Sequence, residues 1–190
     1  MRLTIQGNVI AAEHKFSSKS EMDLIKAVQD GNKQAYHLLY QQYIGQVYGL
    51  CYRLTAEKSM AEDAAQEVFI QLWRKIGNYK GDSKFSTWLH TVTSNITISY
   101  LRKQRGWLYR MMNFEDSPAV NEFAEESSST IDIESYIMRL PERARLVFVL
   151  HAIEGYRHEE IATMTNMAVG SSKSQFHRAK LLLQEWMENE

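Results

Sequence analysis

The chain has 190 residues, of which 44% are hydrophobic and 24% charged, and its formal net charge is −1. This composition is ordinary for a soluble globular protein, and the length suits one domain or two small ones. A single cysteine, Cys51, excludes an intramolecular disulfide, and the lack of any run of about 18 apolar residues excludes a transmembrane helix. Because the N-terminus has neither a basic leader nor a long apolar segment, we expect a cytoplasmic protein.

Helices are the only regular elements that the sequence predicts. The chain contains two prolines, so long stretches lack a helix breaker, and β-alternation is absent. Ser59 and Glu62 form a capping-box pattern at the start of the third helix, and Gly106 follows the fourth. The helices expected in the first half span residues 22–28, 32–54, 59–76 and 84–105.

A change of composition at Trp107 divides the chain. Residues 107–132 are acidic, contain Pro118 and a run of serines, and show little hydrophobic periodicity, which is typical of a flexible linker. Structure is expected to resume near Ile133 with about four shorter helices, among them one from Pro141 to just before Gly155, one at 159–167 and one at 171–187.

We therefore expect an all-α protein of two small helical domains joined by a flexible acidic linker. The two domains are expected to move independently until a partner orders them. The predicted parts are an N-terminal extension (1–19), a first domain (20–106), the linker (107–132) and a second domain (133–190).

Charge is distributed unevenly along this near-neutral chain. Residues 74–110 contain eight Lys and Arg residues and one acid, Asp82, whereas residues 113–137 contain seven acids and no Lys or Arg. A basic block beside an acidic linker indicates a local surface that binds a polyanion.

The last sixty residues contain a helix-turn-helix pattern. A short helix and a tight turn at 166–170 precede a longer helix, whose N-terminal end carries Lys173, Ser174, His177 and Arg178 on its polar face. A recognition helix places such side chains in the major groove of DNA. A helical hairpin that packs against another protein, with these residues merely solvated, remains the alternative.

The third helix carries apolar residues on its polar face. Ile70 and Trp73 lie near Asp63, Gln66 and Glu67, opposite the core face. An apolar residue ringed by polar ones is typical of a protein-binding hot spot, although isolated exposed apolar residues are common. The pattern leaves both interpretations open.

The polar side of the fourth helix contains hydroxyls, an amide and a cation but no acid. Its members are Thr87, Thr91, Ser94, Asn95 and Arg102. Together with the preceding loop, which carries Tyr79 and Lys80, this surface suits a single-stranded nucleic acid, because aromatics stack on bases and cations hold the backbone. A solvated polar face is the alternative.

Catalytic patterns are lacking, so we expect no enzyme, cofactor or metal site. The sequence has no Gly-rich phosphate loop and no Cys/His cluster with metal-ligand spacing. His151, Glu154 and His158 are close in sequence, but Gly155 interrupts the helix and separates their faces.

Three groups of residues occur in an order that is specific to one family. They are 63–69 (DAAQEVF), then 81–89 (GDSKFSTWL) continuing through Asn95 to 100–102 (YLR), and then 140–145 (LPERAR), 160–162 (EIA) and 169–179 (VGSSKSQFHRA). Together they resemble the extracytoplasmic-function sigma factors of bacterial RNA polymerase, and the resemblance covers nearly everything from Asp23 to Trp186. It implies a subunit that binds core RNA polymerase and directs promoter recognition, melting and transcription initiation.

The resemblance also implies a role for each face. It assigns core-polymerase binding to Asp63, Gln66, Glu67, Ile70 and Trp73. It assigns binding of the single-stranded −10 element to Tyr79, Lys80, Lys84, Thr91, Asn95 and Arg102. It assigns binding of the duplex −35 element to Ser171, Lys173, Ser174, Gln175, His177 and Arg178. Tyr79 and Asn95 match positions around a pocket for a flipped base, whose capture would melt the promoter without ATP.

Further partners follow from the resemblance alone. Family members are commonly held inactive by an anti-sigma factor, often membrane-bound, and have no small-molecule substrate. Gln175 stands where the family usually has Arg, and Ser171-Ser172 where it usually has Thr-Val, which puts the −35 sequence in doubt. A stand-alone helix-turn-helix repressor and a protein-only adaptor are the rival functions.

Overall fold

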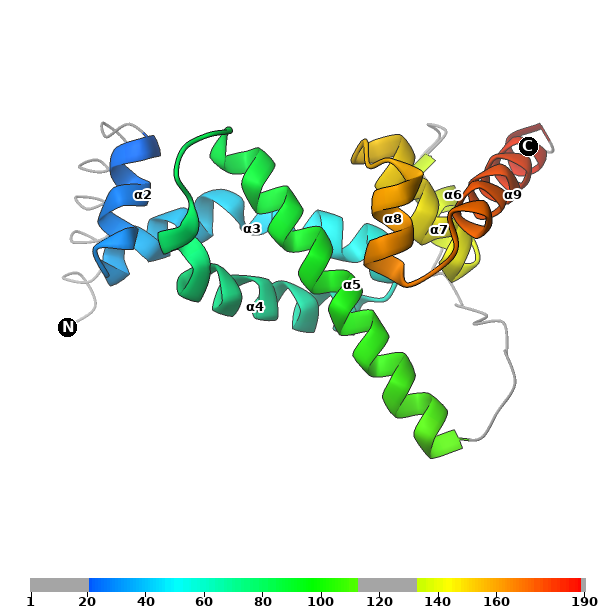
Figure 1. Ribbon diagram of the computed structural model, residues 1–190, viewed down its shortest axis with the longest axis horizontal. Helices are drawn as coiled ribbons and strands as arrows, with labels where there is room; N and C mark the ends of the chain where they lie inside the picture. The colour runs from blue at the N-terminus through cyan, green and yellow to red at the C-terminus, as the bar shows by residue number, and fades with distance from the viewer. Residues whose placement is uncertain (1–20, 113–132, 189–190) are drawn as a thin grey trace, which may run out of the picture.

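The computed structural model describes residues 21–112 and 133–188, and every element in these two segments is helical (Figure 1). The prediction of an all-α fold is confirmed. The predicted N-terminal extension and residues 113–132 of the predicted acidic linker lie outside the described residues, whereas residues 107–112 of that linker belong to a helix. The first segment contains α2 (Glu21–Gln29), α3 (Lys33–Thr55), α4 (Lys58–Lys75), η1 (Ile76–Asn78) and α5 (Phe85–Met112). The second contains α6 (Ile133–Arg139), α7 (Glu142–Phe148), η2 (Val149–Ile153), α8 (His158–Thr165) and α9 (Val169–Glu188).

Helix α3 is the central element of the first domain. The side chain of Asn32 caps it by accepting hydrogen bonds from the backbone amides of Gln34 and Ala35 at 2.9 and 3.0 Å. It ends at Ala56, which adopts a left-handed conformation with φ 53°. Along α3, a buried residue recurs every three or four positions, and this stripe faces α2, α4 and α5. Its members are Ala35, Leu39, Tyr43, Val47, Leu50, Cys51 and Leu54.

Two helix ends differ from the sequence-based expectation. Helix α4 begins at Lys58 and is capped by the carboxylate of Glu57, which accepts from the Ser59 amide at 3.2 Å, so the predicted Ser59–Glu62 capping box is wrong. Helix α5 continues through Gly106 to Met112. A glycine costs a helix interior only about 1 kcal/mol relative to alanine, so it weakens a helix without necessarily ending it.

The second domain is a helix-turn-helix built on α7. Helix α8 ends at Asn166, which is left-handed with φ 56°, and a short turn leads directly into α9. Ala179 and Leu183 of α9 pack against Tyr136, Leu140 and other buried residues of α6 and α7. The predicted helix-turn-helix is therefore confirmed in outline, with α9 beginning at Val169, two residues before the predicted start.

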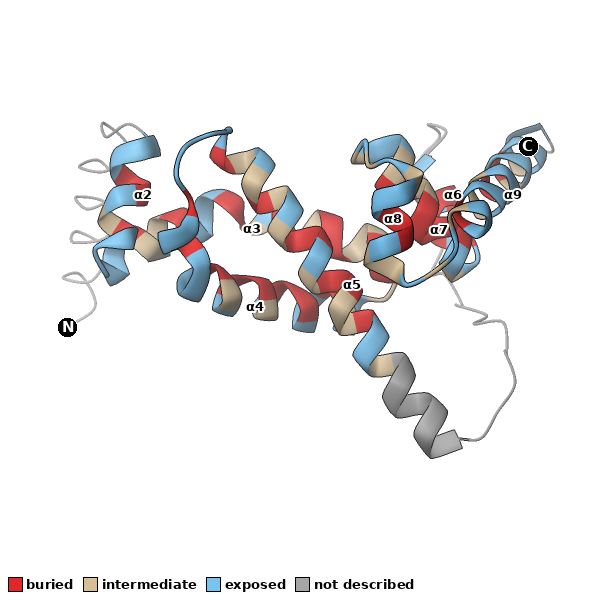
Figure 2. Ribbon diagram, in the orientation of Figure 1, coloured by how far each residue is buried: buried red, intermediate tan, exposed pale blue. Residues whose placement is uncertain are grey.

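The two domains are in contact rather than separate. Helix α8 lies against α5, and α6 and α7 lie against α3 (Figure 1). One buried cluster contains Leu50, Leu54, Ile98 and Leu101 of the first domain together with residues of the second. Buried residues therefore continue from the first domain into the second in Figure 2. The sequence predicts two domains that move independently, which differs from this arrangement. The apolar residues that join the domains cannot be told, from the sequence, from residues buried inside a single domain.

Candidate protein and nucleic-acid interfaces

The outer face of α4 carries the residues that the sequence predicts to bind a protein. Ile70 and Trp73 are 43% and 37% exposed, and Asp63 and Gln66 are exposed beside them. Glu67 is half-buried and accepts a hydrogen bond from the Gln71 amide at 2.8 Å. The predicted set lies on one side of α4 because Ala61, Ala64, Ala65, Val68 and Leu72 occupy the other side against the core.

Two tyrosines of α3 enlarge this face, and sequence analysis missed them. Tyr36 packs edge-on against Trp73 with ring centroids 4.9 Å apart, and Tyr40 packs against Phe69 at 4.6 Å. The Tyr36 hydroxyl donates to the Phe69 carbonyl at 2.5 Å, and burial raises the pKa of Tyr36 to about 12. These rings line a groove of about 900 Å³ between α3 and α4 that also contains Asp63, Gln66 and Ile70. The sequence signal that could have found these tyrosines is their i, i+4 spacing, which places Tyr36 and Tyr40 together on one face of the helix.

The loop before α5 is held by buried contacts. The Gln29 side-chain amide donates to the carbonyls of Ile76 and Tyr79 at 2.8 and 2.9 Å. The Tyr79 hydroxyl donates to the Ser83 carbonyl at 2.6 Å, and its ring packs against Phe85 and Trp88. Because Tyr79 is only 7% exposed, its ring shapes the loop from inside and presents little surface for stacking in this conformation.

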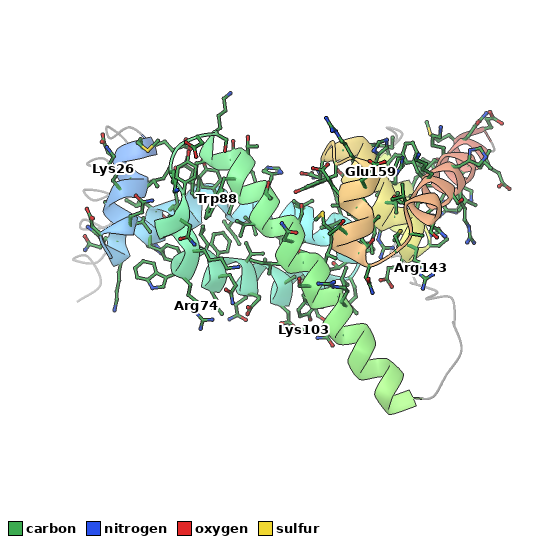
Figure 3. All side chains as sticks on the ribbon, viewed as in Figure 1. Lys26, Arg74, Trp88, Lys103, Arg143 and Glu159 are labelled. Carbon is green, nitrogen blue, oxygen red and sulfur yellow. The ribbon has the colours of Figure 1, made fainter. Side chains whose placement is uncertain are left out.

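Lys80 and Lys84 are exposed on this loop, and Thr91, Asn95 and Arg102 are exposed along α5. The Asn95 amide donates to the Thr91 carbonyl at 2.9 Å, which orients its side chain along the helix. Ser94 differs from the sequence-based expectation, because it is fully buried rather than part of the polar face. Arg74 and Lys103, two exposed cations of the basic block, lie on the same side of the first domain in Figure 3.

The predicted recognition helix α9 presents most of its polar residues to solvent. Ser171, Lys173, Ser174, His177 and Arg178 are exposed. Gln175 is half-buried, and its side-chain oxygen has no hydrogen-bond partner within the described residues. Gln175 therefore points partly inward, unlike the other members of the predicted set.

Histidines fix the N-terminal end of α9. Nδ1 of His158 lies 2.9 Å from the hydroxyl of the buried Ser172, and the rings of His158 and His151 stack with centroids 4.2 Å apart. Partial burial and the charges of His151 and Lys173 lower the pKa of His158. Glu154 pairs elsewhere, with His90, and no group of three potential metal ligands occurs within residues 21–112 and 133–188. None of the helices in these segments is long and apolar enough to cross a membrane.

A helical fold with a helix-turn-helix and an exposed basic face defines a DNA-binding transcription factor of two domains. Residues 39–107 match the family Sigma-70 region 2, and residues 130–183 match the family Sigma-70, region 4. The chain belongs to the extracytoplasmic-function family of RNA polymerase sigma factors. It binds core RNA polymerase and directs promoter recognition, and a stand-alone repressor is not favoured.

Individual relatives agree with this assignment. The RNA polymerase sigma-H factor of Pseudomonas aeruginosa is 32% identical over 180 residues, covering 86% of this chain and 92% of the relative. The ECF RNA polymerase sigma factor SigW of Bacillus subtilis is 30% identical over 176 residues, covering 85% and 93%. The sigma factor RpoE of Bartonella quintana, solved in complex with the anti-sigma factor NepR, has a similar fold, with a TM-score of 0.53 and 23% identity over 80% of this chain and 96% of that one.

Proposed function

We propose that this sigma factor contacts core RNA polymerase through the groove between α3 and α4. The observation that carries this assignment is the exposure of Ile70 and Trp73 beside the tyrosines of α3. Aromatic and aliphatic side chains ringed by polar ones form the energetic centre of many protein interfaces. Asp63, Gln66 and Glu67 form the polar rim of this face and orient the partner.

The −10 element is bound by α5 and the loop before it. Lys80, Lys84 and Arg102 supply cations for the backbone of the melted strand, and Thr91 and Asn95 supply groups that can read base edges. Tyr79 acts as a positioning residue, since its ring and hydroxyl hold the loop from the inside. Capture of unpaired bases by this surface favours the melted promoter through binding energy alone.

The −35 element is bound by the N-terminal half of α9. Lys173 and Arg178 are exposed cations on one face, with Ser174 and His177 between them. A helix that follows a tight turn in a helix-turn-helix inserts this end into the major groove. Ser171 and Gln175 lie at the edge of this face, so we assign them smaller contributions.

The boundaries of the functional parts are proposed to follow the sequence: 20–106 for polymerase and −10 binding, 107–132 for a tether, and 133–190 for −35 binding. We also propose a cytoplasmic site of action, where polymerase and promoter DNA occur. An anti-sigma factor is a proposed partner, since the similar fold of the Bartonella sigma factor was solved with one.

Abortive transcription with purified core polymerase and a library of random promoter fragments tests the proposal. Transcripts should appear only when this chain is added, and they should weaken when Asp63 and Gln66 are both changed to Ala. An active core that makes no transcripts with the chain, together with tight binding of the chain to bare duplex, would instead support a repressor.

A further inference from the structure

A side chain from α5 holds one acid of the proposed polymerase-binding face. The Tyr100 hydroxyl donates a hydrogen bond to Oδ2 of Asp63 on α4 at 3.1 Å, although the two residues are 37 positions apart in the chain. Asp63 is exposed, whereas Tyr100 is half-buried and packs against the core of the first domain. The exposed carboxylate is therefore connected, through Tyr100, to the interior of the domain.

The Tyr100 hydroxyl is itself held by a neighbour one turn further along α5. The Gln104 side chain forms a hydrogen bond with it. A carboxylate can only accept, so the single hydroxyl proton goes to Asp63 and the Gln104 amide donates to the phenolic oxygen. Burial, together with the hydrogen bond to Asp63, raises the pKa of Tyr100, so the hydroxyl keeps this proton at neutral pH.

The other polar residues of this face are arranged differently. Glu67 accepts from Gln71 of its own helix at 2.8 Å, and Gln66 is exposed on α4. Asp63 lines the groove between α3 and α4. A residue from a third helix, α5, thus fixes an acid at the edge of a groove that α3 and α4 form.

A carboxylate held in this way is suited to a cationic group of a partner. Each carboxylate oxygen can accept more than one hydrogen bond, so the bond from Tyr100 leaves acceptor sites on Asp63 for a second donor. A free side chain loses rotamer freedom when a partner binds, and a side chain that is already restrained loses less. The Tyr100 hydroxyl therefore lowers the entropic cost of a contact between Asp63 and a Lys or Arg of the polymerase.

The stability of the first domain depends little on this hydrogen bond. Helices α4 and α5 pack against each other and contribute apolar residues to one core, among them Ala64 and Val68 of α4 and Phe85 and Leu89 of α5. A single hydrogen bond to an exposed carboxylate adds little to the stability of such a core. Its position within the proposed polymerase-binding face therefore favours a role in binding.

We infer that Tyr100 is a positioning residue for polymerase binding, whose hydroxyl orients the Asp63 carboxylate toward the partner. The inference rests on the proposed function and adds a residue of α5 to the polymerase-binding face. Around α5, Tyr100 lies about 140° from Asn95 and about 160° from Arg102. One side of this helix thus supports the polymerase contact, while the opposite side carries the proposed −10 residues.

Replacement of Tyr100 by Phe tests this role, because it removes the hydroxyl and keeps the ring in the core. Y100F should weaken binding of the full-length chain to core polymerase about two- to tenfold, as expected for the loss of one hydrogen bond. Fluorescence anisotropy measures the Kd, and chemical denaturation shows whether the free energy of unfolding is kept. Tyr156→Phe removes a hydroxyl from a half-buried tyrosine of the second domain and should bind core as the wild type does.

A double-mutant cycle with Asp63→Ala separates positioning from a structural role. Without the carboxylate the Tyr100 hydroxyl has nothing to orient, so Y100F should cause no further loss of core binding in the D63A background. The same fold-loss in both backgrounds, or an unchanged Kd for Y100F alone, would overturn the inference. Normal binding by D63A would contradict the proposed polymerase-binding face as well, whereas a loss with D63A but not with Y100F would contradict only the role of Tyr100.

Discussion

The guanidinium of Arg145 donates a hydrogen bond to the backbone carbonyl of Thr55 across 90 positions of sequence, at 2.9 Å. This contact joins the first turn of α7 to the last turn of α3, and so joins the two domains of the sigma factor. Since the same guanidinium also donates to the Leu140 carbonyl, it supports the turn before α7 and the domain contact together.

Replacement of Arg145 should therefore destabilise the protein. Arg145→Leu removes the donors to the backbone carbonyls of Thr55, Leu140 and Met138. Leaving a buried polar group without a partner costs about 1–3 kcal/mol. Chemical denaturation followed by circular dichroism measures the free energy of unfolding. Arg143→Leu, two positions earlier and exposed, should change it far less. Equal losses in the two variants would contradict the role assigned to Arg145.

Ile70 should contribute more to polymerase binding than its size suggests. Truncation of a central hot-spot residue costs about 2 kcal/mol or more, so Ile70→Ala should weaken binding to core polymerase by at least about thirtyfold. Ile153 is a matched control, because it is the same residue type with the same exposed fraction of 43%. Fluorescence anisotropy with labelled sigma factor measures the Kd. A comparable loss with Ile153→Ala would show that surface hydrophobicity in general, and not the α4 face, drives binding.

Asn95 should affect promoter melting without affecting duplex recognition. Its amide lies on the exposed face of α5, where it can contact an unpaired base edge, and loss of one such hydrogen bond costs about 0.5–1.5 kcal/mol. Asn95→Ala should reduce fluorescence from 2-aminopurine placed in the −10 element, at unchanged affinity for a −35 duplex in the holoenzyme. Gln42→Ala, which removes an exposed side-chain amide from α3, should melt the promoter normally.

Lys173 should contribute a phosphate contact at the −35 element. Lys173→Ala is expected to weaken holoenzyme binding to all −35 sequences to a similar extent and to reduce the slope of log K against log salt by about one. Lys26→Ala on α2 removes an exposed charge far from α9 and should leave the slope unchanged. A loss confined to one base sequence would mean that Lys173 reads a base instead.

Cys51 should report on unfolding of the first domain. Burial raises the pKa of its thiol to about 11, and its sulfur lies 3.3 Å from the Thr97 hydroxyl. At pH 8 the thiol is therefore protonated as well as buried, whereas an unfolded cysteine is partly ionised. Reaction with a thiol reagent should be slow in the native protein and fast in denaturant. Fast labelling under native conditions would show that the first domain opens locally around Cys51.

The faces of single helices could be read from the sequence with good accuracy. The small residues of α4 predicted its core side, and the exposure of Ile70, Trp73, Asp63 and Gln66 followed from helical periodicity. The helix-turn-helix and the exposed cations of α9 were predicted in the same way. These features depend on local spacing, which a sequence contains directly.

The ends of helices and the burial of polar residues could not be predicted as well from the sequence. Gly106 does not end α5, because the energetic cost of one glycine is small compared with that of breaking a long helix. Ser94 is polar and Tyr79 carries a hydroxyl, yet both are buried. Elements distant in sequence cover them, so helical periodicity did not predict their burial.

Periodicity by itself predicted an all-helical chain with apolar residues on the outer face of α4, an acid-free polar face on α5 and a basic N-terminal end on α9, because each depends on the order of residues along one helix. The resemblance to sigma factors, and not periodicity, implied what these faces bind. Only the tertiary structure decided that Tyr36 and Tyr40 join the α4 face and that Leu50, Leu54, Ile98 and Leu101 join the two domains. The physical reason is that an apolar side chain on a helix reveals that it will be buried but not which partner will cover it. That choice depends on contacts between residues far apart in the chain, such as Arg145 and Thr55.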